Sequence, residues 1–172
     1  MKLKTLAWTT AATVATAAAG GVATDPRSGW YLKLRKPDWQ PPAIAFPVVW
    51  TALYADLAVT SAVALDRAAE LDRADSPGPV RNDHSRELRA YRGALAANLV
   101  LNASWSWFFW RSRRPWLAAA EAAVLAASSA DLVRRTYRLN RVAGASLAPY
   151  AAWCSFATVL STAIARLNPA SR

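Results

Sequence analysis

Five long apolar runs, separated by segments rich in charges and prolines, constrain this chain more than any other feature. The runs cover about residues 5–23, 46–65, 91–110, 116–133 and 147–167. Loops are predicted between them, among them 134–141 and a loop over 66–90 with flexible parts, which contains Pro77-Gly78-Pro79. A helix of roughly 20 apolar residues spans the hydrocarbon core of a bilayer, and a helix satisfies its own backbone hydrogen bonds in lipid. The pattern predicts an all-α membrane protein, a five-transmembrane-helix bundle formed by a single domain over residues 1–172.

The composition agrees with this arrangement once the positions of the charges are considered. Mean hydropathy is only +0.08 although 54% of the residues are hydrophobic, because alanines are numerous and the charges gather between the runs. The net charge of +10 would suggest a nucleic-acid partner in a soluble protein. Here lysines and arginines flank the apolar runs, which indicates contact with lipid headgroups. The sequence therefore argues against nucleic-acid binding.

The first apolar run has two interpretations. Lys2 and Lys4 precede it and small residues such as Ala17 to Ala19 end it, a pattern also typical of a cleaved signal peptide. The local pattern leaves both interpretations open. If all five runs span, the termini lie on opposite sides, with 12 lysines and arginines on the N-terminal side and 9 on the other. This difference favours a cytoplasmic N-terminus only weakly.

Four segments carry motifs that occur together and in a fixed order. The first is KPDWQPP at residues 36–42, followed by FPVVWTALY at 46–54. The others are LNASWSWFF at 101–109, PYAAW at 149–153, and SFATVL at 155–160 with RLN at 166–168. In this order, within a chain of five apolar runs, they resemble the TspO/MBR family over residues 30–168. The chain departs from the family pattern at Asp38, Ile44 and Ser161. The resemblance favours a retained first helix in a multi-pass protein.

Helical spacing predicts three faces that carry rings or amides. Such faces can line a flat apolar cavity for a planar hydrophobic ligand. The alternative is ordinary core packing and, for the two asparagines, an interhelical hydrogen bond. The faces are Trp50, Tyr54, Leu57 and Ser61; Asn98, Asn102, Trp105 and Phe109; and Trp153, Ala157, Leu160 and Ile164.

The resemblance implies a ligand and a set of contacts. It implies binding of a porphyrin (protoporphyrin IX or a haem-like tetrapyrrole), with no obligatory cofactor and with sterols as a further ligand class. The protein would then sense, carry or regulate its ligand. The expected ligand-binding residues are Trp39, Pro41, Pro42, Phe46, Trp50, Tyr54, Asn98, Asn102, Trp105, Trp153, Ala157 and Leu160.

Three cations in the proline-rich loop, Lys33, Arg35 and Lys36, are candidates for the propionates, with headgroup contact as the alternative. The resemblance also implies a homodimer. Gly93 and Ala97, four residues apart, would allow close approach between helices.

Two other function classes stay open. One is a photo-oxidative enzyme that degrades porphyrin, with Trp50 and Trp153 as electron donors; the other is a sterol or small-molecule transporter. Asp56, within an apolar run, is either a functional charge, as the second class would use, or a structural group bonded to a neighbouring helix. No metal site is expected, because the single Cys154 and the single His84 lie in unrelated segments. Trp107, Trp110 and Trp116 lie beside arginines and are expected to be interface anchors.

Overall fold

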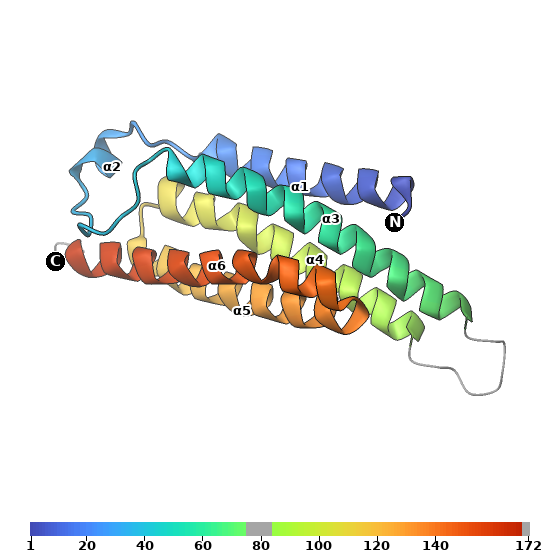
Figure 1. Cartoon of the computed structure of the whole chain (residues 1–172). Coiled ribbons are helices and arrows are strands. Elements are labelled where there is room, and N and C mark those ends of the chain that lie inside the picture. Colours follow the sequence, from blue (N-terminus) through green and yellow to red (C-terminus); the bar gives the residue numbers. More distant parts are fainter. Residues whose placement is uncertain (75–83, 170–172) are drawn as a thin grey trace.

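The computed structural model describes residues 1–74 and 84–169, which form a bundle of long helices with one short helix at its end (Figure 1). The long helices are α1 (Leu3–Ala23), α3 (Ala45–Ala74), α4 (His84–Ser106), α5 (Pro115–Leu139) and α6 (Arg141–Leu167). The short helix α2 (Gly29–Lys33) follows α1, and a π-helical turn η1 (Trp107–Arg111) continues α4. The described residues contain no strand, so the all-α prediction is confirmed.

Four of the helices, α1, α3, α5 and α6, are long and apolar enough to cross a membrane. Helix α4 is not among them by composition. Its first turns carry charges such as Glu87 and Arg89, and its middle carries Asn98 and Asn102. It nevertheless packs against α1, α3 and α5. The prediction of several membrane helices is confirmed, whereas the count of five is not decided by hydropathy.

The helices are longer than the apolar runs that predicted them. Helix α3 continues past Leu65 to Ala74, and α4 begins at His84, so the predicted loop over 66–90 is wrong for both of its ends. These residues are mostly alanine, leucine, arginine and glutamate, which favour helix whether or not they are buried. The Pro77-Gly78-Pro79 segment of that predicted loop lies outside the described residues.

Helices α5 and α6 form a hairpin with one connecting residue, where the sequence predicts a loop over 134–141. Asn140 ends α5 and caps α6, its side chain accepting a hydrogen bond from the Ala143 N–H at 2.9 Å. A Cβ atom added to Gly144 would lie 2.3 Å from Cα of Tyr137. Glycine at this position therefore allows the two backbones to touch.

Helix α1 packs into the bundle beside α3 and α4. The Thr9 hydroxyl donates to the Ala58 carbonyl oxygen at 2.8 Å. Near the start of α1, the Asp66 carboxylate accepts from the Thr5 hydroxyl at 2.6 Å and from the Lys2 N–H. These contacts attach both the beginning and the middle of α1 to α3.

The face predicted to mediate a homodimer lies on the outside of α4. Gly93 and Ala97 are both exposed, and nothing lies within 4 Å of a Cβ atom built on Gly93. The homodimer itself stays a prediction.

Candidate ligand site

The proline-rich segment between α1 and α3 crosses one end of the bundle, and we call residues 29–42 the strap (Figure 1). The strap begins with α2, whose first turn is capped by the Ser28 hydroxyl. Asn168, at the end of α6, accepts from the Arg35 N–H at 2.9 Å and donates to the Arg35 carbonyl oxygen at 2.8 Å. The same amide also donates to the Ile164 carbonyl oxygen. The side-chain amide of Asn168 therefore hydrogen-bonds to both the N–H and the carbonyl of Arg35, as the backbone of a neighbouring strand would.

The first aromatic cluster lies beneath the strap, between α3 and α6. Trp50 stacks on Tyr54 with ring centroids 5.3 Å apart, and its edge contacts Tyr150. Trp153 lies 6.0 Å from Phe46 and 5.1 Å from Phe156, and Trp39 of the strap lies 6.0 Å from Phe156. These are two groups of rings, and Trp50, Tyr54 and Trp153 pack against the same core. We call them together the first aromatic cluster: Trp39, Phe46, Trp50, Tyr54, Tyr150, Trp153 and Phe156.

The second aromatic cluster joins α2 to the end of α4. Trp105 stacks on Phe109 at 5.2 Å, Trp30 contacts Phe109 edge-on at 5.5 Å, and Tyr31 lies 4.6 Å from Trp110. The structure therefore groups Trp105 with these rings and not directly with Trp50 and Trp153. Trp110, expected to be an interface anchor, is half-buried and packs against Tyr31 of α2 and Phe109. Trp116, also expected to be an interface anchor, is 54% exposed.

A buried chain of hydrogen bonds joins four helices. The Tyr54 hydroxyl donates to the Asn102 amide oxygen, and the Asn102 amide donates to the Tyr150 hydroxyl at 3.1 Å. The Tyr150 hydroxyl donates to the Asn98 amide oxygen at 2.6 Å. The Asn98 amide then donates to Ser129 at 3.0 Å. Both asparagines are thus engaged in interhelical hydrogen bonds, which is the alternative that the sequence left open.

The acidic residues of the apolar runs also have partners. Asp56 accepts from the Ser146 hydroxyl at 2.6 Å, linking α3 to α6. Glu121 accepts from the Ser104 hydroxyl at 3.2 Å, linking α5 to α4. Asp131 pairs with Arg134 and Arg135 at 2.5 Å on the extension of α5. One carboxylate oxygen of Asp56 and one of Glu121 are therefore hydrogen-bonded to a neighbouring helix.

The remaining predicted contacts lie on the strap and on α6. Lys33 and Arg35 are exposed on the strap, and the Lys36 ammonium lies 4.0 Å above the centre of the Tyr31 ring. On the strap, Pro41 is half-buried and Pro42 exposed; on α6, Ala157 is half-buried and Leu160 buried. Leu160 belongs to the apolar core around Phe109, against which Phe46 and Phe156 also pack, so the two clusters adjoin.

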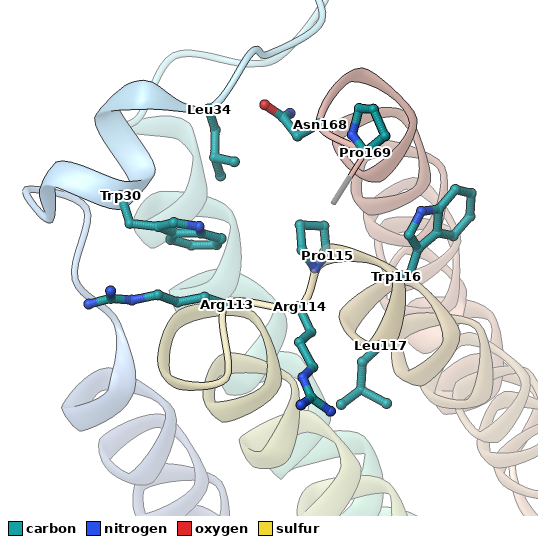
Figure 2. Close-up of a pocket in the computed structure, with 9 residues that line it drawn as sticks. All are labelled: Trp30, Leu34, Arg113, Arg114, Pro115, Trp116, Leu117, Asn168 and Pro169. Atoms are coloured by element: carbon teal, nitrogen blue, oxygen red, sulfur yellow. The ribbon is translucent and has the colours of Figure 1, made fainter. Parts of the chain in front are cut away.

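Two pockets open at this end of the bundle. A pocket of about 480 Å³ lies beside the first aromatic cluster, and Trp39 is the predicted ligand residue among those that line it. It is lined by Pro37, Trp39, Thr158, Val159, Thr162, Ala163, Arg166 and Leu167. A second pocket of about 550 Å³ lies at the turn between η1 and α5 (Figure 2). Neither is lined by Trp50, Tyr54 or Trp153: Trp50 stacks on Tyr54, and Trp153 packs on Phe156.

Comparison with known proteins agrees with the motifs that surround the site. The sequence model of the TspO/MBR family matches residues 7–167. The chain therefore belongs to the TspO/MBR family. It is an integral membrane protein, as the apolar helices of the bundle indicate.

Several relatives within the TspO/MBR family cover most of the chain. A "Tryptophan-rich sensory protein" of Cereibacter sphaeroides is 31% identical over 139 residues, which are 81% of this chain and 77% of the relative. A "Tryptophan-rich protein TspO" of Bacillus cereus is 24% identical over 139 residues, 81% of this chain and 80% of the relative. A "Translocator protein" of Homo sapiens is 29% identical over 142 residues, 81% of this chain and 75% of the relative.

Proposed function

We propose that this TspO/MBR protein binds a tetrapyrrole in the membrane and senses, carries or regulates it. The observation that supports this most is the first aromatic cluster, which continues from the strap through α6 to α3. A planar macrocycle gains stacking and burial against such rings. The pocket of about 480 Å³ beside Trp39 supports entry of the ligand next to α6 and under the edge of the strap.

The charges near the first aromatic cluster also suit a porphyrin. Its ring system is apolar, and its propionates are anionic. Lys33 and Arg35 are exposed on the strap, the segment that also carries Trp39 of the cluster, and they would pair with propionates. Relatives named as a sensory protein and a translocator support a role in which ligand binding is the central event.

We also propose that α4 is the fifth membrane span. Its polar residues Asn98 and Asn102 lower its hydropathy, but both amides are buried and hydrogen-bonded inside the bundle. Polar groups satisfied in this way are tolerated at membrane depth. Helix α4 also packs among α1, α3 and α5, all of which are apolar enough to span.

The test of the ligand proposal is quenching of tryptophan fluorescence by protoporphyrin IX in detergent. We expect Trp50→Ala and Trp153→Ala each to weaken binding by about tenfold, because each removes roughly 1–2 kcal/mol of ring contact. The matched control is Trp8→Ala, since Trp8 is 54% exposed near the N-terminal end of α1. Unchanged affinity in both pocket variants, or an equal loss in the control, would show that this cluster is not the binding site.

A further inference from the structure

The pocket at the turn between η1 and α5 has a composition different from that of the first aromatic cluster. Its volume is about 550 Å³, and it lies where α2, the start of α5 and the end of α6 meet (Figure 2). Apolar walls come from Trp30, Leu34 and Leu117, and cations come from Arg113 and Arg114. No acidic side chain is among its described lining residues. The pocket therefore combines an apolar surface with unneutralised positive charge.

The two arginines have no acceptors of their own within the described part of the chain. Both are exposed, and neither guanidinium has a hydrogen bond or ion pair with a described residue. Arg113 has a φ of 53°, an uncommon left-handed conformation for a residue with a side chain. This turn directs the two side chains apart: Figure 2 shows Arg113 below Trp30 and Arg114 beside Leu117. Two cations thus flank the same turn.

The position of this pocket relative to the apolar helices narrows the class of ligand. Arg113 and Arg114 lie immediately before α5, one of the helices apolar enough to span, and Asn168 lies immediately after α6, which is another. The pocket is therefore at the level where acyl chains give way to headgroups. Trp116, which also lines it, is 54% exposed and suits the same level.

We propose that this pocket binds the headgroup of an anionic phospholipid, with Arg113 and Arg114 supplying positive charge from the two sides of the turn. Guanidinium groups form strong, charge-assisted hydrogen bonds with phosphate oxygens. Trp30, Leu34 and Leu117 offer apolar surface to the glycerol and upper acyl carbons. An anionic lipid complements the positive charge of this pocket. A zwitterionic lipid is less favourable, because the arginines would repel the positive group of its headgroup. The site is separate from the porphyrin site and does not depend on it.

The test uses the full chain purified in a neutral detergent and measures its thermal unfolding against added lipid. Dioleoyl phosphatidylglycerol is compared with dioleoyl phosphatidylcholine and with inorganic phosphate. We expect a saturable rise in the melting temperature with phosphatidylglycerol only. In the double variant Arg113→Gln/Arg114→Gln we expect the midpoint of the titration to move by at least about tenfold, because the pocket loses both of its positive charges.

The matched control is Arg138→Gln/Arg141→Gln, which removes the same charge from exposed positions at the other end of the bundle (Figure 1). This control should respond to phosphatidylglycerol as the parent does. An equal response to both lipids, an unchanged midpoint in the double variant, or an equal shift in the control would overturn the proposal. A full response to inorganic phosphate alone would overturn its assignment to a lipid. Native mass spectrometry of the unsubstituted protein, which should retain phosphatidylglycerol in preference to phosphatidylcholine, tests the proposal independently of whether the variants fold.

Discussion

At the scale of single residues, the asparagines of α4 matter for their hydrogen bonds. Asn98 is fully buried and contacts Tyr150 on α6 and Ser129 on α5, while Asn102 contacts Tyr54 on α3. An amide buried in an apolar bundle is costly unless it is paired. Here both ends of the Asn98 amide are paired across helices, so it stabilises one particular arrangement of three helices.

We expect Asn98→Leu to lower the free energy of unfolding by about 1–3 kcal/mol, because Tyr150 loses its acceptor and Ser129 its donor. The measurement is reversible unfolding in mixed micelles. Val100→Ala, on the exposed face of the same helix, should change stability by no more than about 0.5 kcal/mol. A variant of Asn98 that lost porphyrin affinity but kept full stability would instead identify this amide as a ligand contact.

At the scale of elements, the α5–α6 hairpin depends on a backbone contact. Asn140 is the only residue between the two helices, and Gly144 lies one turn later against the backbone of Tyr137. Backbone atoms cannot move aside as the end of a side chain can. The crossing of α5 and α6, and with it the position of Tyr150 and Trp153, therefore depends on the absence of a side chain at Gly144.

We expect Gly144→Ala to destabilise the protein by about 1–3 kcal/mol, since the added methyl group forces the two backbones apart. The control is Gly21→Ala, because nothing lies within 4 Å of a Cβ atom at Gly21 and alanine favours helix there. Thermal unfolding of both variants in detergent checks this. Equal stabilities for the two would mean that α5 and α6 are not in contact at this point.

At the scale of the whole molecule, the number of spans decides on which sides the termini lie. The N-terminus lies at the end of the bundle opposite the strap, and the last described turn of α6 lies at the strap end (Figure 1). With α4 in the membrane, the chain crosses five times and its termini face opposite compartments. With only α1, α3, α5 and α6 in the membrane, both termini would face the same compartment.

We expect compartment-sensitive reporters fused to the two termini to report opposite sides. Fusions of alkaline phosphatase and green fluorescent protein, which are active on opposite sides of a bacterial inner membrane, provide the measurement. A fusion placed after Asp25, beyond α1, serves as the internal reference for one crossing. Reporters on the same side would reject the fifth span and leave the assignment of the family unaffected.

The sequence by itself determined the class of the protein and its family. Apolar runs of about 20 residues need no partner to be recognised, since the bilayer fixes the length of a span. The ordered motifs, from Pro37 to Asn168, were sufficient for the family, which the comparison confirmed. Helical periodicity also identified the inner faces correctly: Leu57, Ser61, Asn98 and Ile164 are all buried. Hydropathy, however, could not locate the helix ends, because good helix formers continue α3 and α5 beyond the apolar residues.

Only the tertiary structure decided which side chains meet. A period of 3.6 residues assigns Trp105 and Trp153 to inner faces, but it does not say which helix lies opposite each one. Packing brought Trp30 to Phe109, the ring on which Trp105 stacks, and it brought Phe46 to Trp153. It likewise paired both asparagine amides and brought Asn168 to the strap at Arg35. These contacts join residues far apart in the chain, so their partners follow from how the helices cross and not from local pattern.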